Sequence, residues 1–239
     1  MPGPAYFLSK HAFACLSGGS MVLLDLKADR YLALEASRAR SLAGLVAGWP
    51  QLATGAPLPT AEAGNRIAAG MLKRGLLTSE RSQGKELTPP PVAVPADSAI
   101  DTADEGEIPL RLKHLLSFVA AVTAARFHLR FRSMEWIVDD VRRRRARAIR
   151  REGEHELAIR QWARLFDRMR AFTYNAYDAC LFDSLAMLYF LLREGLQPQW
   201  VIGVRSSPSF MAHSWIQHGE TLLNDSLDRV SVYTPIMAA

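Results

Sequence analysis

Cysteine is scarce in this sequence: the 239 residues contain two, Cys15 and Cys180, far apart and in unlike surroundings. A disulfide framework is therefore not expected, and the pattern fits a reducing compartment. The N-terminus lacks a basic stretch followed by an apolar run, so we expect no signal peptide. The longest apolar runs are too short or too interrupted by charge to span a bilayer. These absences favour a soluble cytoplasmic protein.

Two further absences limit the chemistry. No group of Cys, His, Asp and Glu has the spacing of metal ligands. No glycine-rich segment has the pattern of a phosphate-binding loop. We therefore expect neither a metal ion nor a cofactor.

Charge is distributed unevenly along the chain. The formal net charge is +5, yet residues 108–171 hold 16 Lys and Arg against 7 Asp and Glu. Much of this excess is an arginine run between Arg142 and Arg151. Such a run is most often a solvated helix face, and the alternative is a surface for an acidic partner or a nucleic-acid backbone.

Composition divides the chain into two domains of an α+β protein. Residues 82–107 combine a triple proline with many acidic residues and have no apolar periodicity, which predicts a flexible linker. Residues 1–81 then form a small first domain and residues 108–239 a second one.

The first domain begins with short strands. Residues 11–35 predict three of them, separated by a Gly18–Gly19 turn and a turn around Asp29. A helix should run from Ser37 to Trp49 and another from about Thr60 to Gly75. These elements predict a winged-helix-like module.

Residues 22–34 of this module read Val-Leu-Leu-Asp-Leu-Lys-Ala-Asp-Arg-Tyr-Leu-Ala-Leu. This hairpin resembles the recognition elements that bind leader peptides in the biosynthesis of ribosomally made, modified peptides. The resemblance implies that a leader adds as a strand to the sheet edge, where main-chain hydrogen bonds give affinity and side-chain pockets give specificity. The alternative is that the same residues only fill a core. The implied leader-binding residues are Arg30, Tyr31, Leu32, Ala33, Leu34, Ile67, Met71 and Leu72.

The second domain is mostly helical. Apolar residues at helical spacing predict helices, and short alternating runs predict a small antiparallel sheet against which the helices pack. The expected helices cover residues 112–129, 134–151, 155–172 and 180–195, and the expected strands cover 200–204, 212–217 and 221–225.

Cys180 opens the last of these helices, two residues after Asp178, a suitable N-cap. A thiol in the first turn lies beside unpaired N–H groups and the positive end of the helix dipole, which favour the thiolate. Cys180 is therefore a candidate nucleophile, and the alternative is a structural cysteine. Asp183, one turn later, either perturbs this thiol or is an exposed helix acid.

His213 and Asp225 lie on the last two strands. If residues 218–220 form a three-residue loop, His213 faces Asp225, and opposed residues have Cβ atoms about 4.5–5.5 Å apart. A two-residue loop would place Asp225 on the other face. An imidazole oriented by a carboxylate can accept the proton of a thiol and later protonate a leaving amine.

Other residues of the right types fit these roles less well. His218 lies in the turn, Asp228 lies beyond the strand, and Asn224 should point to the opposite face. Cys15 lies on a strand of the first domain with no histidine close by in sequence. It is therefore expected in the core.

Short motifs surround the candidate residues: Cys180-Leu181, Ser184-Leu185-Ala186, Leu191-Leu192-Arg193-Glu194-Gly195, Val201-Ile202-Gly203-Val204-Arg205, Ala212-His213-Ser214-Trp215 and Asn224-Asp225. They resemble the lasso-peptide B-protein family, whose members are leader peptidases with a transglutaminase-like, papain-related fold. The resemblance covers the chain from about residue 110. It implies Cys180 as nucleophile, His213 as base and Asp225 as the group that orients the base. It also implies a precursor peptide as substrate and an ATP-dependent cyclase of the asparagine-synthetase type as partner.

The function that follows is a cysteine peptidase that binds the leader of a lasso-peptide precursor and cleaves it from the core before macrolactam formation. One alternative is a transglutaminase-like acyltransferase that uses the same three residues. Another is a winged-helix DNA-binding regulator, although residues 1–80 are only mildly basic.

Overall fold

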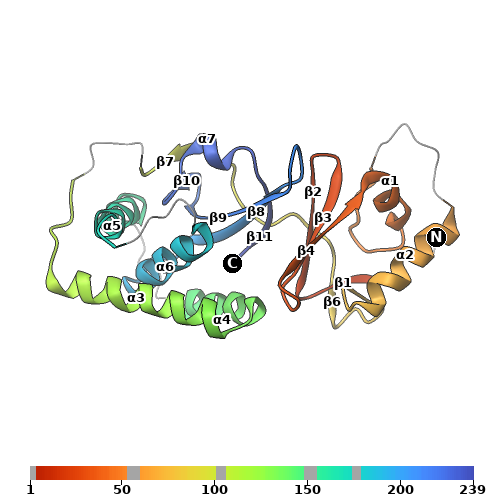
Figure 1. Cartoon of the computed structure of the whole chain (residues 1–239), viewed down its shortest axis with the longest axis horizontal. Coiled ribbons are helices and arrows are strands. Elements are labelled where there is room, and N and C mark those ends of the chain that lie inside the picture. Colours follow the sequence, from red (N-terminus) through yellow and green to blue (C-terminus); the bar gives the residue numbers. More distant parts are fainter. Residues whose placement is uncertain (1–3, 53–59, 101–105, 148–154, 174–178) are drawn as a thin grey trace. The chain divides into compact units, whose positions relative to one another are not determined.

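The structure, a computed structural model, describes residues 4–52, 60–100, 106–147, 155–173 and 179–239. Helix and sheet are mixed throughout (Figure 1). Within these residues, no helix combines the length and apolar character that crossing a bilayer requires.

The chain divides into two compact units that do not follow the sequence in simple order. The first contains Met1–Pro90, Val204–Met211 and Thr234–Met237. The second contains Pro91–Gly203, Ala212–Tyr233 and Ala238–Ala239.

The first unit contains the predicted meander. Its strands are β2 (Ala12–Ser17), β3 (Ser20–Asp25) and β4 (Arg30–Glu35), and they pair antiparallel in the order β2-β3-β4. Both glycines of the first turn take positive φ angles, 51° and 78°, a conformation that glycine adopts without steric cost. In the second turn, the side chain of Asp25 accepts hydrogen bonds from two backbone N–H groups. Three strands in this register confirm the meander.

The first helical segment differs from the prediction. In place of one helix from Ser37 to Trp49 there are α1 (Ala36–Ala39) and a 3-10 turn, η1 (Arg40–Leu42). Gly44 and Gly48 follow with φ angles of 79° and 71°, which an α-helix cannot contain. The helix expectation is therefore wrong beyond Leu42.

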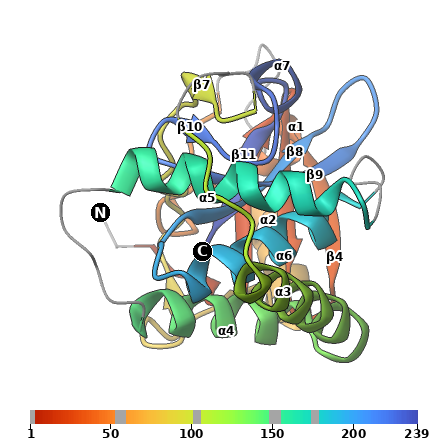
Figure 2. The same ribbon diagram turned by 90° about the vertical axis from the view of Figure 1, so that its left-hand side faces the viewer.

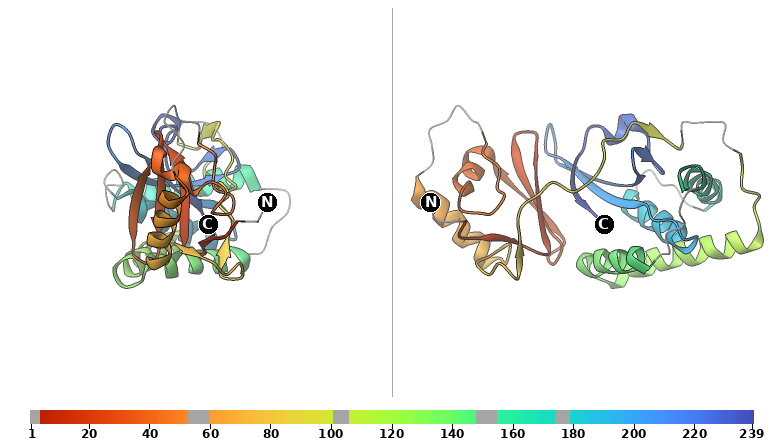
Figure 3. Two further views of the ribbon diagram at one scale, coloured as in Figure 1. Left: turned by 90° about the vertical axis from the view of Figure 1, so that its right-hand side faces the viewer. Right: turned by 180° about the vertical axis from the view of Figure 1, so that it is seen from behind.

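The second helix forms as predicted and packs on the meander. Helix α2 (Ala61–Lys73) begins at Thr60, whose hydroxyl accepts a hydrogen bond from the backbone N–H of Ala63. Figures 1 and 3 show α2 on one side of the three strands. The same unit contains a second small sheet, in the order β5-β1-β6: β1 (Phe7–Ser9), β5 (Leu77–Thr78) and β6 (Gly84–Lys85). The winged-helix description remains a prediction.

The segment expected to be a flexible linker takes part in both units. Strand β6 pairs with β1, and β7 (Asp97–Ser98) pairs in parallel with β10 (Thr221–Leu222). The carboxylate of Asp97 forms an ion pair with the buried Arg160. Parts of the segment expected to be a flexible linker are therefore paired strands, and the Asp97 charge has a partner in the second unit.

The second unit holds the remaining helices. They are α3 (Leu112–Phe131), α4 (Met134–Arg147), α5 (His155–Arg170), α6 (Cys180–Arg193) and α7 (Leu227–Val230). Arg150 and Arg151 lie outside the described residues. The remaining strands are β8 (Gln199–Arg205), β9 (Met211–His218) and β11 (Thr234–Ala238), in a sheet ordered β11-β8-β9-β10-β7, and most of β11 belongs to the first unit. The sheet is not purely antiparallel, since β7 joins it in parallel.

Helix α6 is the centre of the second unit. Every residue from Asp183 to Leu191 is buried. Figures 1 and 2 show α3, α4, α5 and α6 together on one side of β8 and β9. A helix that is apolar on nearly all sides is a core helix, so α6 holds its first residue, Cys180, in a fixed place against the sheet.

Two glycines of α2 offer a matched test of how this helix packs in the first unit. A Cβ at Gly64 would lie 2.4 Å from the backbone oxygen of Ser41, whereas a Cβ at Gly70 meets nothing within 4 Å. We expect Gly64→Ala to destabilise the protein by about 1–3 kcal/mol and Gly70→Ala to stabilise it by up to about 1 kcal/mol. Thermal unfolding and hydrogen exchange in α2 would measure both. Shifts of the same sign would contradict the close approach at Gly64.

Candidate active site

Cys180 is the first residue of α6 and is half-buried. Asp178, predicted as the N-cap, lies outside the described residues, and Ala179 occupies the cap position without a side-chain hydrogen bond. The N–H groups of a first helical turn have no acceptor within the helix. They therefore favour negative charge at the Cys180 sulfur.

His213 lies on β9 and is buried, with 3% of its surface exposed. Its Nε2 atom is 2.5 Å from Oδ2 of Asp225, which is also buried. The other ring nitrogen, Nδ1, remains for the thiol, and His213 forms a side-chain hydrogen bond with Cys180. The structure thus brings together all three residues of the predicted set.

The contact between His213 and Asp225 does not arise from the predicted register. His218 pairs with Thr221 and Gln217 with Leu222, so the loop has two residues, Gly219 and Glu220. The three-residue loop is therefore wrong, and so is the inference that a two-residue loop separates the pair. Strand β10 ends at Leu222, and the chain leaves the ladder before Asp225.

Asn224 explains how the chain leaves the ladder. Its side-chain oxygen Oδ1 accepts a hydrogen bond of 2.8 Å from the backbone N–H of Ile216, in place of a main-chain partner. Its amide donates to Oδ2 of Asp183 over 3.1 Å. This departure from regular pairing lets Asp225 reach His213.

Asp225 is itself held in place. Its backbone oxygen accepts a hydrogen bond of 2.7 Å from the hydroxyl of Ser98 in β7. Its Oδ1 atom accepts one of 2.9 Å from the backbone N–H of Ser226. With Oδ1 engaged in this way, Oδ2 faces His213.

The thiol and the imidazole affect each other's proton affinity. Burial raises the pKa of Cys180, but the hydrogen bond and charge of His213 and the backbone hydrogen bonds of Ser214 and Leu181 bring it below its usual value. Burial lowers the pKa of His213, while the hydrogen bonds with Asp225 and Cys180 raise it to about 9. Opposite shifts of this kind favour a thiolate–imidazolium pair near neutral pH.

Asp183 is buried, which excludes the alternative that it is an exposed helix acid. Its Oδ2 atom accepts hydrogen bonds from Arg170 of α5, over 2.8 Å, and from Asn224. Arg170 thereby balances a carboxylate that lies one helical turn from Cys180. An arginine and an acid thirteen residues apart in sequence give no periodic signal, and only the tertiary packing reveals this pair.

A second buried network joins α6 to the sheet. The indole Nε1–H of Trp200 is 2.7 Å from the hydroxyl of Ser214 and 3.2 Å from that of Ser184, and the two hydroxyls are 2.6 Å apart. Ser184 follows Cys180 by one turn, and Ser214 follows His213 directly. The network therefore fixes the helix that carries the thiol against the strand that carries the imidazole.

The alternative residues lie elsewhere. His218 ends β9 beside the turn, and Asp228 is exposed at the start of α7. Cys15 is buried, and burial raises its pKa to about 12. Among the described residues, no group of three or more His, Cys, Asp or Glu is placed to hold a metal ion.

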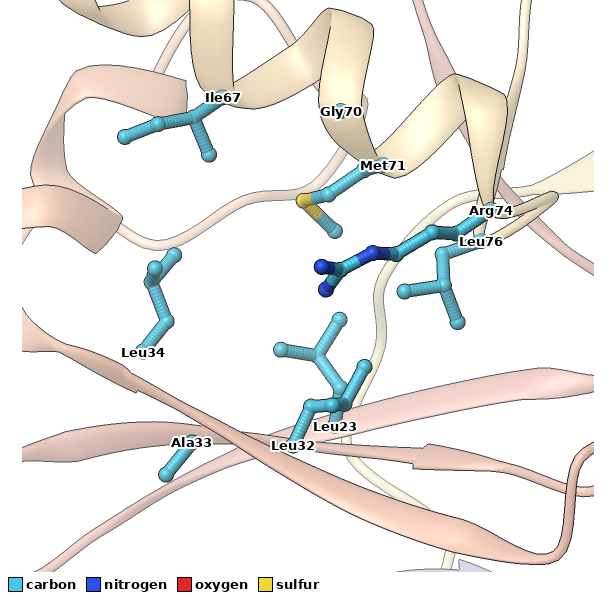
Figure 4. A pocket seen from close by; sticks show the side chains of 9 residues that line it. All are labelled: Leu23, Leu32, Ala33, Leu34, Ile67, Gly70, Met71, Arg74 and Leu76. Carbon is cyan, nitrogen blue, oxygen red and sulfur yellow. The ribbon is translucent and has the colours of Figure 1, made fainter.

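The implied leader-binding residues only partly converge. A cavity of about 250 Å³ lies between β4 and α2, and Leu32, Ala33, Leu34, Ile67 and Met71 are among its lining residues (Figure 4). Arg30, Tyr31 and Leu72 do not line it. Tyr31 packs against Phe210, with ring centroids 5.2 Å apart.

The acidity of Cys180 can be measured by alkylation with iodoacetamide across pH. We expect the alkylation rate to rise at a pH below about 8.5, the pKa of an ordinary thiol. His213→Ala should move the rise to higher pH, because only the backbone hydrogen bonds of Ser214 and Leu181 then oppose the burial that raises the pKa. Cys15 is an internal control that should stay unmodified. The same pH profile in both proteins would contradict the ion pair.

Comparison with protein families agrees with this geometry. Residues 121–238 match the model described as the transglutaminase-like superfamily, and the matched range includes Cys180, His213 and Asp225. Comparison with curated proteins and with solved structures gave no match. The chain therefore contains a transglutaminase-like superfamily domain at residues 121–238.

Proposed function

We propose that the protein is a cysteine peptidase with Cys180 as nucleophile, His213 as general base and acid, and Asp225 as the group that orients His213. The observation that carries this proposal is the buried hydrogen bond of 2.5 Å between His213 and Asp225, next to a thiol at a helix start. A base oriented by a third group is the arrangement that activates a thiol.

The residues provide each step of peptide hydrolysis. The Cys180 thiolate attacks the scissile carbonyl carbon, and the backbone N–H at the start of α6 stabilises the resulting oxyanion. The His213 imidazolium gives its proton to the departing amine as the C–N bond breaks. His213 then accepts a proton from water, which hydrolyses the thioester and releases the acid.

The proposed substrate is the precursor of a ribosomally made lasso peptide, cleaved in the cytoplasm between leader and core. Two observations support it: the motifs around Cys180, His213 and Asp225, and the cavity beside the edge strand β4. Cleavage frees the amine of the core peptide. That amine is then available to an ATP-dependent cyclase of the asparagine-synthetase type, the proposed partner, for macrolactam closure.

Acyl transfer to an amine is the second candidate, because the matching family is described as transglutaminase-like and a transglutaminase transfers an acyl group to an amine. Both reactions begin with the same thioester and differ in what attacks it. Mass spectrometry of the products separates them. Hydrolysis leaves two free termini, whereas transfer leaves a new amide.

Replacing the nucleophile tests the proposal directly. We expect Cys180→Ala to lower the rate of leader cleavage by at least roughly 10³-fold and to leave leader binding unchanged, since Cys180 does not line the cavity between β4 and α2. Cys15→Ala is the matched control and should cleave normally. Release of core peptide by the Cys180→Ala variant, measured by mass spectrometry, would refute the assignment.

Asp225 should control the alkaline limit of activity. Its carboxylate raises the pKa of His213, so the imidazolium needed for catalysis is lost only as pH rises through about 9. In Asp225→Asn the charge is removed and the alkaline limb of kcat against pH should move to lower pH. Asp225→Ala should also lower kcat, by about 10²–10⁴-fold. An unchanged alkaline limb in Asp225→Asn would exclude this role.

A further inference from the structure

The cavity between β4 and α2 has apolar walls and one charged side chain. Leu32, Leu34, Ile67 and Met71 line its sides, and the side chain of Arg74 runs past Leu76 and points its guanidinium group into the cavity toward Met71 (Figure 4). Arg74 is the C-cap residue of α2 and is exposed. No hydrogen bond or ion pair to its side chain is found among the described residues, so its charge lacks a partner there.

The strand beside this cavity is positioned to accept another strand. In the sheet order β2-β3-β4, β4 is at the edge, and no further strand pairs with it in the described part of the chain. An edge strand presents unpaired N–H and C=O groups. Leu32 and Leu34 point to the cavity side and are only half-buried, so apolar surface is available next to those groups.

We infer that Arg74 selects an acidic residue in the peptide strand that the proposed function places beside β4. The inference rests on the proposed function, because it names the chemistry of the peptide that the first unit recognises. A guanidinium group binds a carboxylate through two parallel hydrogen bonds. Apolar walls exclude water and strengthen this pair.

The geometry also limits where the acidic residue lies. In Figure 4 the Arg74 side chain runs back along α2 toward Met71, which follows Ile67 by four residues, or about 6 Å at 1.5 Å per residue. An extended strand covers that distance in about two residues at 3.3 Å each. Because side chains on one face of a strand recur every second residue, the acid should lie two residues from the apolar residue that packs against Ile67.

The experiment is a selection from a displayed library of random twelve-residue peptides on the full chain carrying Cys180→Ala. We expect enrichment of peptides with alternating apolar residues and an Asp or Glu at the stated spacing. Arg74→Glu should enrich Lys or Arg at that position. Lys73→Glu makes the same change of charge one residue earlier, outside the cavity lining, and should keep the acidic preference.

Affinity measurements then quantify the contact. For an enriched peptide, Arg74→Gln should weaken binding by roughly 10- to 100-fold, and replacing the peptide's acid by Gln should have little further effect in that variant. Gly70→Phe should abolish binding, since Gly70 lines the cavity, a Cβ there meets nothing within 4 Å, and the ring would occupy the space of the peptide. Arg74→Glu should regain binding when the peptide's acid becomes Lys.

The outcomes separate this inference from the peptidase proposal. Failure to enrich any peptide, an enriched set without acids, or equal binding by Arg74→Glu and the parent chain would overturn the role of Arg74. None of these results affects cleavage of a precursor by Cys180. Conversely, a charge-selective groove in a chain that cleaves no peptide would uphold the inference and refute the peptidase.

Discussion

The hydrogen bond between His213 and Asp225 is the contact on which the chemistry depends. A half-buried thiol would by itself have a raised pKa, and a buried imidazole a lowered one, so burial alone would leave both groups neutral. The Asp225 carboxylate reverses this for His213, and the charge of His213 in turn reverses it for Cys180. A pKa shift of one unit corresponds to about 1.4 kcal/mol. The folded unit supplies this free energy only if the three side chains are held in fixed positions.

Two buried hydrogen-bond networks hold these side chains in place. The indole of Trp200 joins the hydroxyls of Ser184 and Ser214, so α6 and β9 cannot slide past each other without breaking hydrogen bonds inside the core. Arg170 and Asp183 form the other network. Burying an ion pair costs several kcal/mol per ion before the attraction is counted, so this pair is weak evidence of added stability. Its effect here is to hold Asn224, whose side chain takes the place of a ladder partner.

The elements that carry the candidate residues are predictable from the sequence where the signal is local. Helix α6, its Cys180 start, the meander and the strand of His213 all follow from apolar periodicity and turn residues. The register of the last hairpin is not predictable in this way. A two-residue loop is incompatible with a contact between His213 and Asp225 only if the strand pairing continues to Asp225. Asn224 ends it by bonding to Ile216 through a side chain, and no periodic pattern encodes such a substitution.

Under the proposed function, different residues bind the peptide and cleave it. The triad contacts only the scissile bond, which every peptide has, so it discriminates little between substrates. Selectivity must then come from binding energy at residues remote from the reaction. A segment held in the groove raises the effective concentration of the attached scissile bond, an advantage that depends on the length of peptide between the two segments. The charge of Arg74 would accordingly act on kcat/KM for precursors with an acidic leader, while the protonation of His213 sets kcat for all of them.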